Sequence, residues 1–129
     1  MLNYELADCL TRIRNAYMKR HKDVHVRKTK LNKAVLAVLK EQGSITDFAD
    51  DADNDRIITV VLAYANSRPA MKSIKCVSRP GLRVYYSSQD IPRYKSGLAF
   101  GVISTSKGVM TSHQAKAAGV GGELLCVVE

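Results

Sequence analysis

The chain has 129 residues, of which 46% are hydrophobic, so it is too apolar for a disordered protein and long enough for one domain or two very small ones. Twenty Lys and Arg residues against twelve Asp and Glu residues give a net charge of +8, which favours nucleic acid as the partner and an anionic membrane surface second. No apolar run approaches the roughly 20 residues of a membrane-spanning helix, and we recognise no secretory signal.

The first half of the chain predicts two helices and three strands. Leu6, Leu10, Ile13 and Tyr17 recur at helical spacing, so they form one face of a helix for which Asn3 is the expected N-cap. The expected elements are a helix over 3–19, a strand over 23–27, a helix over 31–39 stopped by Gly43, a strand over 45–48 and a strand over 56–65.

The second half is predicted to be mainly β with one short helix. Residues 66–69 punctuate the chain and are interpreted as a linker. We therefore predict an α+β fold with two small α/β domains: an N-terminal α-β-α-β-β domain over 1–66 and a C-terminal, mainly β domain over 67–129. The expected elements are strands over 71–77, 82–86, 98–103 and 123–128, and a helix over 111–118 whose Thr-x-x-Gln start is a capping box.

The cysteines and histidines do not indicate a metal or disulfide site. Cys9, Cys76 and Cys126 are odd in number, far apart and next to apolar residues, which predicts buried, reduced thiols. The three histidines show no metal-ligand spacing. We expect neither a metal nor another cofactor.

The segment Ser104-Thr105-Ser106-Lys107-Gly108 is the strongest candidate site. It is predicted as a loop between a buried strand and a capped helix, inside a stretch without acids from Asp90 to Glu123. Hydroxyls both donate and accept hydrogen bonds, lysine neutralises phosphate, and glycine lets a ligand approach the backbone. Tyr85 and Tyr86 point to opposite sides of a predicted strand, so one is expected in the core and the other is available for base stacking. These features favour shape-directed RNA binding.

Catalysis is the alternative interpretation of the same segment. Ser104-x-x-Lys107 matches the first motif of penicillin-binding serine enzymes, so a small serine hydrolase is the alternative function. The other motifs of that class are missing or out of order, and no glycine precedes Lys107 at the spacing of a phosphate-binding Walker loop. We therefore predict no catalytic residue and no small-molecule substrate.

Four blocks of sequence carry a resemblance to a known family. They resemble the eighth small-subunit ribosomal protein family in its bacterial and organellar form, and they occur in the same order along nearly the whole chain. The blocks are LADCLTRIRNA (6–16), VSRPGLRVY (77–85), GLAFGVISTSKGVMT (97–111) and AAGVGGELLC (117–126).

The resemblance implies the two-domain fold expected above. It also implies a primary binder of the central domain of small-subunit ribosomal RNA that helps the platform of the subunit assemble beside neighbouring small-subunit proteins. Many members of the family also repress their own operon by binding a messenger RNA of the same shape, which makes its own mRNA a further candidate partner. The implied RNA-binding residues are Ser104, Thr105, Ser106, Lys107, Tyr85, Glu123, Thr11, Arg12, Arg14, Asn15, Lys28 and Lys30.

Two departures from the family pattern concern positions near these residues. The first helix has Tyr4-Glu5 where the family often has Asp-Pro, and Tyr86-Ser87-Ser88 stands where basic residues are common. The second departure removes an expected phosphate contact from residues 86–90. For the compartment, the resemblance implies the ribosome of a bacterial cytoplasm first, and that of a mitochondrion or plastid as the alternative.

Overall fold

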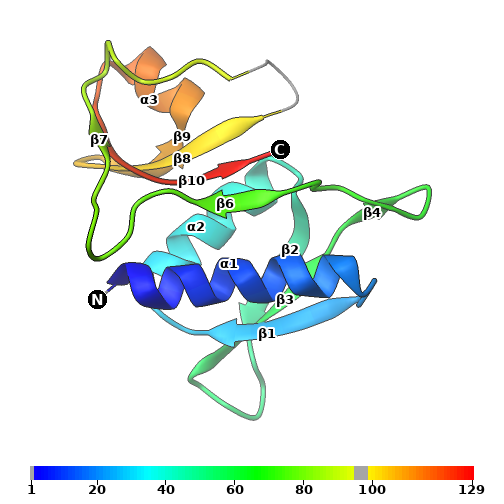
Figure 1. Ribbon diagram of the computed structural model, residues 1–129. Helices are drawn as coiled ribbons and strands as arrows, with labels where there is room; N and C mark the ends of the chain where they lie inside the picture. The colour runs from blue at the N-terminus through cyan, green and yellow to red at the C-terminus, as the bar shows by residue number, and fades with distance from the viewer. Residues whose placement is uncertain (1, 95–98) are drawn as a thin grey trace.

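The computed structural model describes residues 2–94 and 99–129 and has an α+β architecture, as predicted (Figure 1). In the first half the elements are α1 (Leu2–Met18), β1 (Asp23–Arg27), α2 (Lys30–Glu41), β2 (Ile45–Asp50), β3 (Ile57–Leu62) and β4 (Tyr64–Ala65). In the second half they are β5 (Arg68–Pro69), β6 (Ile74–Cys76), β7 (Tyr85–Tyr86), β8 (Phe100–Thr105), β9 (Gly108–Thr111), α3 (Ser112–Ala118) and β10 (Gly122–Val128).

The N-terminal part is a three-stranded antiparallel sheet, in the order β1-β3-β2, with α1 and α2 packed on it. The predicted apolar face of α1 is confirmed, because Leu6, Leu10, Ile13 and Tyr17 are all buried. The helix begins at Leu2, so Asn3 lies inside its first turn rather than at the expected cap. Helix α2 has its N-cap at Thr29, whose hydroxyl accepts a hydrogen bond from the Asn32 amide at 3.0 Å.

The C-terminal part is an antiparallel sheet in the order β6-β10-β8-β9, with β7 paired to the first residues of β10. Helix α3 packs on β8 and β9. Its predicted capping box is confirmed: Thr111 and Gln114 each accept a hydrogen bond from the other's backbone amide. Gly119 ends the helix with a φ of 70°, a left-handed conformation that favours glycine.

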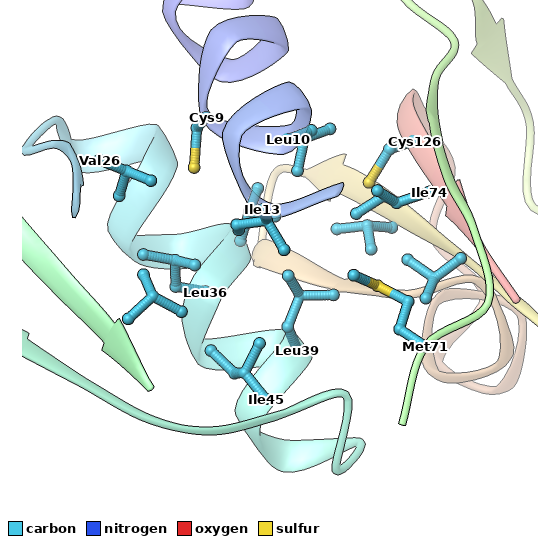
Figure 2. Close-up of a cluster of buried hydrophobic side chains, with 14 of the residues drawn as sticks. Cys9, Leu10, Ile13, Val26, Leu36, Leu39, Ile45, Met71, Ile74 and Cys126 are labelled. Atoms are coloured by element: carbon cyan, nitrogen blue, oxygen red, sulfur yellow. The ribbon is translucent and has the colours of Figure 1, made fainter. Parts of the chain in front are cut away.

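The main hydrophobic core is continuous between the two halves of the chain. Figure 2 shows Leu10 and Ile13 of α1 between Leu36 and Leu39 of α2 on one side and Ile74 on the other. Both halves therefore lose buried apolar contacts if α1 is displaced. This core contains residues from both sides of the expected boundary between 1–66 and 67–129. The division into two domains stays a prediction.

Residues 66–69, the predicted linker, belong to a short hairpin, in which β4 pairs with β5. Asn66 and Ser67 form its turn with φ values of 54° and 65°. Two successive left-handed residues are what a tight two-residue hairpin turn requires. The Tyr64 hydroxyl donates to the His21 carbonyl at 2.6 Å and holds the hairpin against the end of α1.

Several predicted strands are shorter than expected. In the segment 82–86 only β7 is a strand, because Leu82 instead exchanges two backbone hydrogen bonds with Arg79 across the Pro-Gly turn. The expected strand over 98–103 corresponds to β8, and its first expected residue, Leu98, lies outside the described residues. The gap at residue 63 separates β3 from β4 within the expected strand over 56–65.

The three cysteines are free thiols, as expected, and burial raises the pKa of each. For Cys9 the pKa rises to about 12, so at pH 8 only about one thiol in ten thousand is the reactive thiolate. We predict that iodoacetamide at pH 8 leaves Cys9 and Cys126 unmodified in the native protein and modifies all three thiols in guanidinium chloride. Intact-mass and peptide analysis measure both; rapid native modification of Cys9 would show that α1 opens.

Candidate RNA-binding surface

The β8–β9 hairpin positions the Ser-Thr-Ser-Lys segment. Ser104 and Thr105 are the last residues of β8, Ser106 and Lys107 form a two-residue turn, and Gly108 begins β9 with a φ of 115°. The expected loop between a strand and a helix is therefore a hairpin turn followed by a further strand. The turn holds Ser106 and Lys107 exposed at the end of a supported sheet.

The hydroxyl of Thr105 is used inside this turn. It donates to the Gly108 carbonyl at 2.8 Å and accepts from the Lys107 amide at 3.1 Å. One side chain thus binds two backbone groups at the two ends of the turn. Of the three hydroxyl residues, Thr105 has a structural task, which leaves Ser104 and Ser106 as the stronger candidates for contacting a ligand.

Strand register brings three predicted site residues into one row. Tyr85 of β7 lies opposite Glu123 of β10, and Glu123 lies opposite Ser104 of β8. Directly opposed residues of antiparallel strands share a face of the sheet, so these three side chains are neighbours. Tyr85 is 66% exposed, whereas Tyr86 packs against the smaller core cluster, as the alternation of the strand predicted. We call Tyr85, Glu123 and Ser104 the site row.

Glu123, the acid of the site row, has a cationic partner. Arg83 Nη1 lies 3.4 Å from Glu123 Oε2, and the Glu123 side chain is only 14% exposed. This ion pair offsets the negative charge at the centre of the row. Arg83 stands inside the VSRPGLRVY block but is not among the predicted site residues.

Two glycines let the strands of the row approach closely. A Cβ atom on Gly122 would lie 2.0 Å from the Ser104 carbonyl oxygen, and one on Gly121 would lie 2.3 Å from the Tyr86 carbonyl oxygen. No side chain fits at either distance, so the Gly-Gly pair sets the spacing of β7, β10 and β8 beside the row.

The predicted residues of α1 are all exposed but divide into two groups. Thr11, Arg14 and Asn15 lie on one stripe of the helix and form the first group. Arg12 lies beside this stripe and is the second. Burial raises the pKa of Cys76 in β6; the positive charges of Arg79 and Arg14 oppose that rise, and Glu123 adds to it.

Arg12 lies apart from the site row. Its Nε is 2.9 Å from Asp8 Oδ2, and it lines a shallow basic pocket with Arg27 and Arg56. Sequence reasoning did not identify this pocket, because its residues come from three segments.

The two predicted lysines near α2 also lie away from the row. Lys28 Nζ is 2.8 Å from Asp50 Oδ2, and this hydrogen bond lowers the pKa of Asp50. Lys30 is exposed as the first residue of α2. The structure therefore places Lys28 in an ion pair and leaves Lys30 as the freer charge of the two.

Residues 2–94 and 99–129 contain no cluster of three or more His, Cys, Asp and Glu side chains that could hold a metal ion. The structure shows no helix in the described part of the chain that is long and apolar enough to span a membrane. Among the hydrogen bonds of this part, none joins the Lys107 amine to Ser104 or Ser106, so the serine–lysine pair of the hydrolase alternative is not assembled.

Comparison with known proteins identifies the family. The model of the family described as ribosomal protein S8 matches residues 5–128, which include every predicted site residue. This chain belongs to the ribosomal protein S8 family. Small ribosomal subunit protein uS8 of Nitrosomonas europaea is 51% identical over 124 residues, covering 95% of both chains. The uS8 proteins of Neisseria meningitidis serogroup B and Pseudomonas fluorescens are 49% and 46% identical over 123 residues, again covering 95% of both chains.

Membership of the S8 family accounts for the fold described above, with an α/β N-terminal part and a mainly β C-terminal part carrying one short helix. The relatives are ribosomal proteins, and an S8 protein is not expected to be an enzyme. The family match covers the site row and both glycines beside it.

Proposed function

We propose that this chain is a structural constituent of the small ribosomal subunit, not an enzyme, and a primary binder of the central domain of its ribosomal RNA. The observation that carries the proposal is the site row with the adjacent hairpin turn. It gathers an exposed ring, a carboxylate and hydroxyls from three distant segments on one edge of a protein with a net charge of +8. This combination suits RNA, which presents unstacked bases, 2′-hydroxyls and phosphates together.

Each group then has a task at the RNA surface. The exposed ring of Tyr85 packs on a base or sugar, and Ser104 and Ser106 exchange hydrogen bonds with base edges and 2′-hydroxyls in the shallow minor groove. Lys107 neutralises a phosphate. Glu123, held by Arg83, accepts hydrogen bonds and orients the hydroxyls of the row. Thr11, Arg14 and Asn15 contact the backbone from α1, whereas Arg12, Lys28 and Lys30 contribute at longer range.

The remaining parts of the proposal concern partners and compartment. Neighbouring small-subunit proteins are direct contacts, and the messenger RNA of the chain's own operon is a second RNA ligand if it folds into the same shape. The uS8 relatives come from bacteria such as Nitrosomonas and Neisseria, which supports ribosomes of a bacterial cytoplasm. An organellar ribosome is the alternative.

The test is filter binding with the purified protein. A short hairpin carrying the central-domain site is expected to bind, with an affinity that falls steeply with salt, and a hairpin of equal length and composition but scrambled sequence is expected to bind at least about tenfold more weakly. Equal affinity for both hairpins would mean that the protein binds polyanions without specificity and would refute the proposal.

Lys107→Ala is predicted to lower the RNA affinity and to make the dependence of log K on log salt shallower by about one unit, because one phosphate contact is lost. Lys107 is exposed in the turn, so stability is expected to change by less than about 0.5 kcal/mol. The matched control is Lys19→Ala, an exposed lysine after the end of α1, for which the slope is expected to stay the same. A Lys107→Ala slope equal to the wild-type slope would mean that Lys107 is only solvated.

A further inference from the structure

A groove of about 410 Å³ lies between the C-terminal half of α1, the β4–β5 hairpin and the segment that leads into β6. Its floor and walls are apolar and come from Tyr17, Met18, Pro69, Met71 and Ile74. We call it the α1 groove. Figure 1 shows the end of α1 and the β4–β5 hairpin on the right and β7 of the site row on the left, so the α1 groove and the site row occupy different ends of the molecule.

Met18 is the most unusual residue of the α1 groove. Its side chain is 75% exposed, more than any other large hydrophobic residue in the described part of the chain. Met71 beside it is buried and continues into the main core. A flexible thioether at the mouth of an apolar groove adapts its shape to an inserted side chain, and its burial by a partner is favourable.

The rim of the α1 groove is cationic. Arg14, Arg68 and Lys72 line it. Arg14 also belongs to the α1 stripe that the proposed function assigns to RNA, so Arg68 and Lys72 are the two charges left for a second ligand. No carboxylate is among the described residues around the groove. A ligand that complements this arrangement has an apolar anchor flanked by negative charges. The groove offers no exposed aromatic ring for a base, since the ring of Tyr17 is buried and lies edge-on to Tyr64 at 5.5 Å. An acidic, apolar protein segment therefore fits better than RNA.

The hairpin wall of the groove is rigidly held. Besides the bond from Tyr64 to His21, the Arg20 guanidinium donates to the Ser67 carbonyl, and the Tyr17 hydroxyl donates to the Ser44 carbonyl at 2.5 Å and accepts from the Ala63 amide at 3.0 Å. Ser67 adopts a left-handed backbone conformation, which is unfavourable for residues other than glycine and is therefore maintained by its surroundings. A wall that is already in place lowers the entropic penalty of docking.

We infer that the α1 groove docks an apolar segment, flanked by acidic residues, of a neighbouring protein in the assembled subunit, while the site row holds RNA. The inference deepens the proposed function, and its assembled-subunit arm rests on it. Both surfaces are engaged at once because they lie at different ends of the molecule.

The first arm of the test uses assembled small subunits that contain p-benzoylphenylalanine in place of Met18. Irradiation is expected to yield an adduct with a protein segment that mass spectrometry identifies as apolar and acidic. The same photoreactive residue at Leu82, which is 69% exposed near the site row, is expected to crosslink to RNA. The double variant Arg68→Glu, Lys72→Glu is expected to lower the protein adduct roughly tenfold, because two exposed charge contacts are reversed.

An RNA adduct from position 18 would assign the α1 groove to RNA and overturn the inference. An absent adduct, or a protein adduct that the double variant leaves unchanged, would also overturn it.

The second arm uses the free protein and does not depend on assembly. If the chain does not enter subunits, that outcome contradicts the proposed function only, and the second arm still tests the inference. A synthetic peptide with a pair of leucines flanked by glutamates is titrated while the methyl resonances of Met18 and Met71 are followed. Saturable shifts are expected for this peptide and at least about tenfold weaker binding for the same peptide with lysines. Met18→Glu is expected to abolish the shift of the Met71 methyl resonance and leave the affinity for the RNA hairpin unchanged. Equal binding of both peptides contradicts the inference.

Discussion

Replacing Gly122 with alanine is expected to lower the free energy of unfolding by about 3 kcal/mol. The new Cβ would lie 2.0 Å from the Ser104 carbonyl oxygen and 2.9 Å from its carbon, both of them backbone atoms of β8. No rotamer change removes this overlap, so β8 and β10 must separate at the Gly122–Thr105 end of their ladder. Urea unfolding followed by circular dichroism measures the loss as a lower midpoint with an unchanged slope.

Gly81→Ala is the matched control for this prediction. A Cβ atom on Gly81 meets nothing within 4 Å, and the Gly81 backbone has no positive φ, so the stability of the Gly81→Ala variant is expected to stay within about 0.5 kcal/mol of the wild type.

Gly122→Ala is also expected to weaken binding of the RNA hairpin at temperatures where the variant is folded, because Ser104 and Glu123 are no longer held opposite each other. Wild-type stability of Gly122→Ala would mean that the close approach of β8 and β10 is not a requirement of the fold.

The long helices and the antiparallel strands of the N-terminal part were predictable from sequence. Apolar residues at helical spacing give α1 and α2 one buried face each. Gly43, with a φ of 80°, follows the end of α2. Alternation in Asp23–Arg27 likewise predicts β1, whose inward residue Val26 is buried. Such local patterns are strong because each depends on neighbouring residues only.

Short elements that depend on contacts between segments were not predictable. Strand β9 is not predictable from sequence. Gly108 is typical of a loop, and the capping box at Thr111 predicts that a helix follows that loop directly. Its strand conformation comes from pairing with β8, which periodicity does not reveal. The β4–β5 hairpin is not predictable either, because Asn66 and Ser67 are turn-forming residues that are as typical of a linker as of a hairpin.

The candidate site was predictable as a set of residues but not as a surface. Residue chemistry indicates Ser104 and Tyr85, and the family resemblance adds Glu123, but only the register of β7, β10 and β8 makes the three neighbours. The ion pair between Arg83 and Glu123 joins residues 40 positions apart, so no sequence spacing indicates it. The pairing of Lys28 with Asp50, 22 positions away, likewise required the structure.

The second large effect is expected for Ser106→Ala, which should weaken RNA binding by roughly 1–3 kcal/mol and leave stability within about 0.5 kcal/mol of the wild type. Ser106 is exposed at the tip of the hairpin, so its hydroxyl is available to a base edge or a 2′-hydroxyl. Removing it leaves the polar partner on the RNA without a hydrogen bond in a desolvated contact. Filter binding measures the affinity and thermal unfolding measures the stability.

Thr105→Val, which keeps the shape of the side chain, separates contact from turn formation. It removes the hydroxyl that joins the Gly108 carbonyl to the Lys107 amide, so it is expected to lower the free energy of unfolding by about 1 kcal/mol. RNA affinity is expected to fall less than for Ser106→Ala, because the valine variant loses only the order of the turn. The reverse pattern, with Thr105→Val costing more affinity than Ser106→Ala, would make Thr105 the hydroxyl that contacts RNA and require the turn to open on binding.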